Sequence, residues 1–389
     1  MVLPKIATAM SLPLNDGYSI PTISFGTGSK WKWHDVTTYV QLALESGFSH
    51  LDTAAFYETE PFVGCAIKES GLARKDLFLT TKCGLMIPLR KSLKNNLEKL
   101  GVEYVDLFLI HNHFFVPDIK EAWKEMEKLK EEGLTRSIGV SNYEVKHLKQ
   151  TMRVAKVKPA VNQISLNPYN YAEMKPIIDY CQENGIVVEA YSSLAPITTY
   201  PGGPVDIPIT AAGLRLGITP TQVIFLWVRA KGAVIVTTTS SKGRMKEYLA
   251  VNDLPPTSLT HEEIAAIDHA GANGPPPGPG PSSPSQPEST SSSSSFLTSS
   301  SFHLSPLSRI LSSLSSWSSP SPPKDASLGV DLEKSPLPLP PSYPTTTQTP
   351  PPMRHPPTKI TLVGVITILL LSITSILGIV LVLAGLFCC

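Results

Sequence analysis

The chain has 389 residues with 33 basic and 32 acidic side chains, so its formal net charge is +1. This balance argues against a nucleic-acid partner, because proteins that neutralise phosphates carry a basic excess. The composition changes at Ala272. The first 272 residues contain 28 basic residues, 28 acidic residues and 16 prolines, whereas the last 117 contain 5 basic residues, 4 acidic residues and 21 prolines. Only the first part has the composition of a globular protein, so we predict one folded domain over residues 12–272.

The cysteines and the N-terminus of this domain indicate a reducing compartment. Cys65, Cys83 and Cys181 are scattered and form no CxxC pair, and secreted domains that depend on disulfides show a denser pattern. The first residues contain no apolar run long enough for a secretory signal. The sequence therefore predicts that this domain lies in the cytosol.

Eight short apolar segments recur along the domain, mostly without alternation, which is typical of parallel strands covered on both faces. They are residues 22–26, 48–53, 77–82, 105–111, 137–142, 160–165, 186–192 and 233–239. Amphipathic segments separate them, most clearly over residues 117–133, where Asp118 suits a helix start and Gly133 a helix end. Eight such units predict an α/β fold, a closed (β/α)8 TIM barrel. A doubly wound open sheet is the alternative, but the GxGxxG turn expected of it is missing.

Ionisable residues follow three successive predicted strands. Asp52, Lys82 and His111 stand at strand ends, and Tyr57 lies in the loop after Asp52. Each residue alone suits a structural role, such as a helix cap or a solvated lysine, yet a barrel would bring all four to one rim. A lysine beside a tyrosine hydroxyl lowers the tyrosine pKa, and an aspartate keeps the lysine charged. This set suits proton donation to a carbonyl oxygen.

A metal site is the alternative for two histidines at this rim. His111 and His113 are close enough in sequence to share an ion, but no cluster of carboxylates accompanies them. We therefore predict no metal.

The ordered motifs of the domain carry a family resemblance. GFSHLDTAAFYETE, DLFLTTKCG, YVDLFLIH, IGVSNY, VNQISLNPY and VEAYSSLAP occur in this order. Over about residues 12–270 the chain resembles the aldo-keto reductase superfamily. The resemblance implies an NADP-dependent oxidoreductase that reduces aldehydes or ketones to alcohols by hydride transfer. It implies that Tyr57 is the general acid, Lys82 lowers the pKa of Tyr57, Asp52 holds Lys82, and His111 orients the carbonyl group.

The same resemblance implies that NADPH is the cofactor and suggests its contacts. The expected contacts near the nicotinamide and its ribose are Thr27, Ser141, Asn142, Gln163 and Tyr191. The expected contacts near the phosphates and the adenine are Ser192, Leu194, Lys242, Arg244 and Glu247. The residues themselves support the second group, since TTTSSKGR places hydroxyls and two cations where a helix should begin, which suits an anion.

The substrate side departs from the family pattern. Trp31, His111 and Asn112 are the expected substrate contacts, and Asn112 stands where many members have tryptophan. A small carbonyl compound is the expected partner, and the barrel is expected to be monomeric. The alternative is a barrel that senses a cofactor or binds a partner with little catalysis.

The last part of the chain differs from the folded domain in composition. Residues 273–359 are predicted to be a disordered linker rich in proline and serine, with 21 serines among the 40 residues 282–321. Residues 360–386 carry no charge, and a helix of this length spans a bilayer, so 360–387 is a predicted transmembrane helix. Arg354 and Lys359 precede it and predict a tail anchor with the barrel in the cytosol. A GPI signal would look similar but needs a signal peptide.

Overall fold

The computed structural model describes residues 10–255 and 257–276. The predicted transmembrane helix and all but the first residues of the predicted linker lie outside these ranges.

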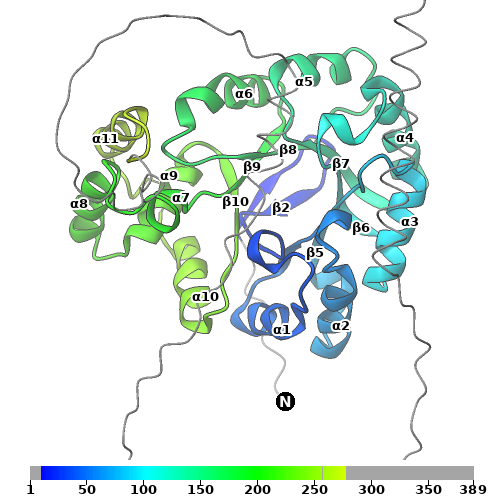
Figure 1. Cartoon of the computed structure of the whole chain (residues 1–389), viewed down its shortest axis with the longest axis horizontal. Helices are drawn as coiled ribbons and strands as arrows, with labels where there is room; N and C mark the ends of the chain where they lie inside the picture. The colour runs from blue at the N-terminus through cyan, green and yellow to red at the C-terminus, as the bar shows by residue number, and fades with distance from the viewer. Residues whose placement is uncertain (1–9, 256, 277–389) are drawn as a thin grey trace, which may run out of the picture. The chain divides into compact units, whose positions relative to one another are not determined.

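The barrel strands are parallel and close into a ring (Figure 1). In chain order they are β3 (Ile23–Gly26), β4 (His50–Asp52), β5 (Phe78–Lys82), β6 (Val105–Ile110), β7 (Thr135–Ser141), β8 (Val161–Ser165), β9 (Val187–Tyr191) and β10 (Ala233–Thr237). Each falls within or overlaps one predicted apolar segment. β10 pairs with β3 through Ile235 and Ile23, which closes the ring. The barrel prediction is confirmed, and the open-sheet alternative is wrong.

Helices surround this ring and cover its outer face (Figure 1). They are α1 (Thr37–Ser46), α2 (Glu60–Ser70), α3 (Leu89–Leu100), α4 (Ile119–Glu131), α5 (Val145–Met152), α6 (Tyr171–Glu183), α7 (Ala195–Thr198), α8 (Asp206–Leu216), α9 (Pro220–Ala230), α10 (Lys242–Leu249) and α11 (His261–Ala272). The predicted start of α4 is confirmed, because the Asp118 side chain accepts hydrogen bonds from the backbone N–H groups of Lys120 and Glu121. Trp123 and Met126 are buried at helical spacing against the core.

A small hairpin lies at the N-terminal end of the barrel. Its strands are β1 (Ser11–Pro13) and β2 (Ser19–Pro21), and they pair antiparallel. Leu14 and Ile20 of the hairpin region join Phe78, Leu107 and other buried apolar side chains in a separate core cluster. The hairpin therefore seals this end of the barrel with apolar side chains. Strands of three residues leave little periodicity, so the sequence did not predict them.

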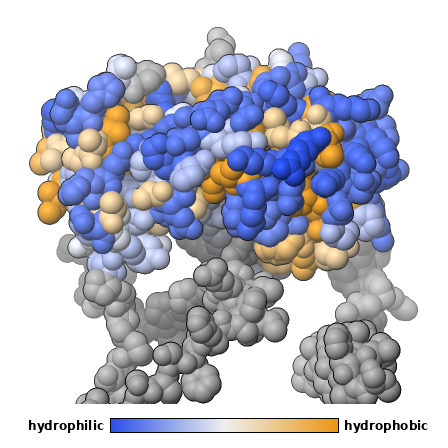
Figure 2. Space-filling model, turned by 90° about the horizontal axis from the view of Figure 1, so that it is seen from above, coloured by the Kyte–Doolittle hydropathy of each residue, from blue (hydrophilic) through white to orange (hydrophobic). Residues whose placement is uncertain are grey.

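The surface of the described residues is mixed in polarity. On the face drawn in Figure 2, hydrophilic residues predominate and hydrophobic residues form separate clusters. Within residues 10–255 and 257–276, we find no single helix with the length and hydrophobicity to cross a bilayer. The helices α8 and α9 pass such a test only as a pair bent by 98°.

Candidate active site

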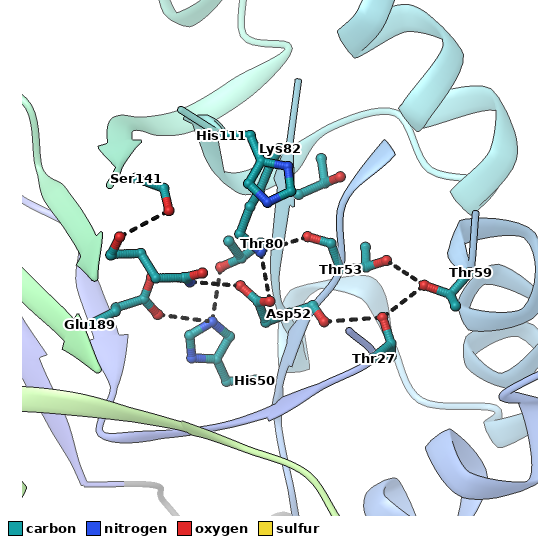
Figure 3. Close-up of polar contacts among 12 residues, drawn as sticks. Thr27, His50, Asp52, Thr53, Thr59, Thr80, Lys82, His111, Ser141 and Glu189 are labelled. Atoms are coloured by element: carbon teal, nitrogen blue, oxygen red, sulfur yellow. Dashed lines mark hydrogen bonds and ion pairs between the residues drawn. The ribbon is translucent and has the colours of Figure 1, made fainter. Parts of the chain in front are cut away.

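The C-terminal ends of the strands bring the predicted tetrad together. Asp52 and Lys82 are the last residues of β4 and β5, and His111 directly follows β6. Tyr57 ends a short 3₁₀ turn, Ala55–Tyr57, between β4 and α2. Side chains two apart in a strand share a face, so His50 lies below Asp52 in the barrel interior (Figure 3).

A buried ion pair forms the centre of this end. Lys82 Nζ donates hydrogen bonds to Asp52 Oδ1 at 2.6 Å and to the Thr53 carbonyl oxygen at 2.9 Å. Both side chains are almost fully buried. Burial acts to lower the pKa of Lys82, but Asp52 and Tyr57 outweigh it and the pKa is raised. Lys82 is therefore a fixed cation, as the sequence predicted.

Tyr57 lies above this cation. Lys82 Nζ is 5.1 Å from the centre of the Tyr57 ring, and the rings of Tyr57 and His111 are 5.5 Å apart. Burial raises the pKa of Tyr57, while Lys82 acts in the opposite direction without prevailing. Lys82 therefore acts on the pKa of Tyr57 in the predicted direction, but burial has the larger effect and the pKa is raised overall. Tyr57 keeps its proton at neutral pH, which is the state that a proton donor needs.

His111 is a neutral side chain in this arrangement. Burial, and then the charges of Lys82 and Lys32, hold the pKa of His111 well below its ordinary value. Its ring packs 5.1 Å from that of Phe115, and its carbonyl oxygen accepts a hydrogen bond from Asn142 Nδ2 at 3.1 Å. A neutral imidazole beside Tyr57 can donate a hydrogen bond to a substrate oxygen without adding charge.

A chain of threonine hydroxyls supports the loop that carries Tyr57. Thr59 Oγ1 lies 2.8 Å from Thr27 Oγ1 and 3.0 Å from Thr53 Oγ1 (Figure 3). Thr27 also donates to the Asp52 carbonyl oxygen at 3.3 Å. Thr27 was predicted as a cofactor contact, and the structure places it beneath the loop, one strand from Asp52. The two other hydroxyls were not predicted, because a lone threonine in a loop gives no distinctive sequence signal.

Three further polar residues form the floor of the site. Gln163 Nε2 donates to Asp52 Oδ2 at 2.8 Å and to Glu189 Oε2 at 3.0 Å. His50 Nε2 lies 2.9 Å from Thr80 Oγ1 and 3.8 Å from Glu189 Oε1. Burial lowers the pKa of His50 to about 3, so its ring is neutral. Glu189 was missed by sequence reasoning. Its signal is a single acidic residue inside the apolar strand VVEAY.

The predicted nicotinamide contacts gather at the ends of β7, β8 and β9. Ser141 Oγ donates to the Gln163 carbonyl oxygen at 2.9 Å, and Asn142 Nδ2 donates to Ser141 Oγ at 3.0 Å. Tyr191 donates its hydroxyl proton to Asn142 Oδ1 at 2.8 Å. Asn142 has a left-handed backbone with φ of 58°. A hydroxyl and two amides beside a partly exposed tyrosine ring match the donors and acceptors of a carboxamide on a flat ring.

The predicted phosphate contacts lie at the start of α10. The Ser241 side chain caps this helix by accepting from the Arg244 backbone N–H, and the Arg244 side chain is exposed. Lys242 pairs with Glu45 at 2.8 Å, and Glu247 accepts a hydrogen bond from the Thr219 hydroxyl at 2.6 Å. Cations, hydroxyls and a helix N-terminus together fit a phosphate group.

Ser192 and Leu194 follow β9, on the loop that enters α7. Ser192 is exposed with φ of 58°, and Leu194 is half-buried at the start of that helix.

The two further residues predicted to contact substrate, Trp31 and Asn112, lie in different places. Trp31 Nε1 donates to Thr238 Oγ1 at 3.0 Å, and the Trp31 ring lies 4.1 Å from that of Tyr39. This anchor holds Trp31 toward β10. Asn112 is half-buried, and its Oδ1 atom has no hydrogen-bond partner within the described residues, so it could accept from a bound molecule.

His113 points toward a different neighbour from His111. Its ring stacks on that of His147, with centres 3.9 Å apart. Within residues 10–255 and 257–276, no group of three or more histidine, cysteine, aspartate or glutamate side chains could hold a metal ion.

Comparisons with known proteins agree with this geometry. Residues 22–200 match the model of the aldo/keto reductase family. The chain is 36% identical to a NAD/NADP-dependent indole-3-acetaldehyde reductase of Schizosaccharomyces pombe, over 64% of this chain and 93% of the relative. It is 34% identical to an NADPH-dependent alpha-keto amide reductase of Saccharomyces cerevisiae, over 66% and 89%. It also resembles the structure of a Bombyx mori aldo-keto reductase in complex with NADP, with a TM-score of 0.60, 32% identity, and coverage of 68% and 93%.

Proposed function

Because this chain belongs to the aldo/keto reductase family, we propose that it reduces an aldehyde or ketone to an alcohol, with Tyr57 as the proton donor. It is an NADP-dependent oxidoreductase, and NADPH is its cofactor. The bound cofactor supplies the hydride that the carbonyl carbon receives. The remaining chemistry belongs to side chains of this barrel.

The protein's part of the reaction is to hold the carbonyl oxygen and supply its proton. The oxygen would lie between Tyr57 and the neutral His111, whose rings are 5.5 Å apart. As the oxygen gains negative charge, Tyr57 transfers its phenolic proton to it. The resulting phenolate is stabilised by Lys82, whose charge is in turn held by Asp52. Ser141, Asn142 and Gln163 would hold the carboxamide of the cofactor, and Arg244 would bind its 2′-phosphate.

One observation carries this proposal. A lysine with 0% side-chain exposure is paired to an aspartate at 2.6 Å, and its Nζ lies 5.1 Å from the centre of the Tyr57 ring. Burying such a pair is costly for stability, so its position beside a tyrosine that can donate a proton favours a catalytic use. The same observation argues against a barrel that only senses the cofactor.

Replacing Tyr57 with phenylalanine tests this assignment. Tyr57→Phe removes the donated proton and keeps the ring, so kcat should fall by about 10²–10⁴-fold. NADPH affinity, measured by fluorescence titration, should stay within about twofold. Tyr39→Phe is the matched control, since Tyr39 packs on Trp31 outside the tetrad. Reduction by Tyr57→Phe at near wild-type rate would contradict the proposed role.

The tail proposal stands on sequence alone. We propose that residues 360–387 anchor the chain in a membrane and keep the barrel in the cytosol, since 27 uncharged residues follow Arg354 and Lys359. The full chain should enter the membrane fraction and resist extraction by alkaline carbonate. A chain ending at residue 359 should enter the soluble fraction with unchanged kcat. Equal fractionation of the two would refute the anchor.

A further inference from the structure

Glu189 is a carboxyl group inside the barrel that the proposed reaction leaves unused. It lies on β9, is fully buried, and shares the floor of the site with Asp52, Lys82 and His50 (Figure 3). A buried carboxyl without a structural ion pair is expensive to keep. Its position beside a predicted cofactor contact therefore calls for a functional reason.

The Gln163 amide connects Glu189 to the cofactor side. An amide NH₂ group has two protons, and Gln163 Nε2 gives one to Asp52 Oδ2 and one to Glu189 Oε2. Both donors are therefore used by carboxyl groups from two different strands, β4 and β9. Turning the amide over would place its carbonyl oxygen against Asp52 and, once Glu189 is ionised, against a second acceptor, which is unfavourable.

We propose that Glu189 is a positioning residue for the cofactor: together with Asp52 it fixes the Gln163 amide so that its carbonyl oxygen, and not its NH₂ group, faces the nicotinamide carboxamide. This inference rests on the proposed function, because it takes Gln163 as a cofactor contact. The carboxamide would then have to present its own NH₂ group to Gln163.

The same carboxyl makes the cofactor site sensitive to pH. Burial and the neighbouring Asp52 raise the pKa of Glu189 well above 4.5, while Gln163 and Lys82 act in the opposite direction. Among the charged and titratable groups that face it, His50 is neutral and Lys82 stays charged, because the pKa of Lys82 is raised. At low pH, Lys82 is balanced by Asp52 alone. Ionisation of Glu189 then adds one buried negative charge.

That added charge acts differently on the two forms of the cofactor. The nicotinamide ring of NADP⁺ is positive and that of NADPH is neutral, so a negative Glu189 favours NADP⁺. Rising pH should therefore weaken NADPH binding relative to NADP⁺ binding. The 2′-phosphate is common to both forms, so its titration cancels in the ratio of their dissociation constants.

The experiment measures the dissociation constants of NADPH and NADP⁺ for the full chain by calorimetry, at intervals between about pH 6 and pH 9.5. In the wild type, the ratio of the NADPH constant to the NADP⁺ constant should rise by about 3- to 30-fold across this range. Glu189→Gln is uncharged and similar in volume, so its ratio should stay flat. Its amide can also pair with a turned Gln163, which the ionised carboxylate of the wild type cannot do.

Glu60→Gln is the matched control. Glu60 is also buried, and burial raises its pKa to about 7, but its partner is Thr81 and it does not contact Gln163. The pH response of the ratio should persist in this variant. A response that persists in Glu189→Gln, or is lost in Glu60→Gln, overturns the inference. So does a wild-type ratio that does not change with pH, a result that needs no variant to fold. Failure of the wild type to bind either nucleotide would overturn the proposed function as well.

Discussion

The two ends of this barrel use charged residues in opposite ways. At the N-terminal end, Asp106 pairs with Arg74 at 2.6 Å and with Arg136 at 2.9 Å, and both guanidinium groups lie over the ring of Tyr104. The two arginines are partly exposed. At the C-terminal end, Lys82 and Asp52 are buried with 0% and 2% exposure.

The difference lies in what each arrangement costs. Asp106 is buried, but its two arginines remain partly hydrated, so the N-terminal cluster keeps more of its solvation than the C-terminal pair and can stabilise the fold. The C-terminal pair loses most of its solvation, and an apolar pair of similar size could be as stable. We infer that the first cluster is kept for stability and the second for chemistry. Substitutions at each end separate these two purposes.

The largest expected effect is at the C-terminal end. Lys82→Met leaves Asp52 buried without its cation and Tyr57 without a stabilised phenolate, so kcat should fall by about 10³-fold and the free energy of unfolding by about 3 kcal/mol. Steady-state kinetics and urea unfolding measure the two changes. Lys99→Met removes an exposed lysine that pairs with Glu58, and it should change neither. Retained activity in Lys82→Met would place the chemistry elsewhere.

At the N-terminal end, loss of a charge from an ion pair should lower stability without changing catalysis. Asp106→Asn removes the charge that faces Arg74 and Arg136, so the free energy of unfolding should fall by about 2 kcal/mol while kcat stays within about twofold. Urea unfolding measures the change in stability, and steady-state kinetics measure kcat. Asp179→Asn breaks only an exposed pair with Lys175 and should change stability by less than about 0.5 kcal/mol. A drop in kcat for Asp106→Asn would remove the contrast between the ends.

A smaller effect is expected at the exposed rim of the catalytic end. Arg244→Ala should raise KM for NADPH about tenfold, which corresponds to about 1.4 kcal/mol, and leave KM for NADH unchanged. Lys246→Ala, on the same helix, should change neither value. If both cofactors lost affinity equally, Arg244 would not contact the 2′-phosphate.

The smallest effect concerns a carboxyl between the barrel and its helices. The folded state holds a proton on Glu60 up to about pH 7, whereas the unfolded chain releases it near 4.5. Glu60 therefore lowers the free energy of unfolding as pH rises from 4.5 to about 7. Compared with wild type, Glu60→Gln should gain Tm progressively across this window, and the gain should level off above about pH 7. Glu69→Gln, at an exposed position, should gain nothing. A constant difference at all pH values would contradict the raised pKa.

The sequence predicted the fold through its strands and the site through its strand ends. β5 (FLTTK) and β6 (VDLFLI) are short, fully buried strands with apolar segments, and Lys82 and His111 stand at or just beyond their ends, so strand prediction placed both residues. Glu189 and His50 were not predicted as site residues, because their role depends on neighbours across the barrel interior. The raised pKa of Tyr57 also depends on burial, which no local pattern records.

The pairing of β10 with β3 has a consequence for how the chain folds. Ile235 faces Ile23 across this seam, and Trp31 reaches Thr238 beside it, so contacts more than 200 residues apart must form before the ring is complete. Until then, the first and last strands both present unpaired edges. Contacts of such long range slow folding, and open edges favour association between chains. Refolding should therefore become less efficient as protein concentration rises, and this seam should be the last part of the sheet to gain protection from hydrogen exchange.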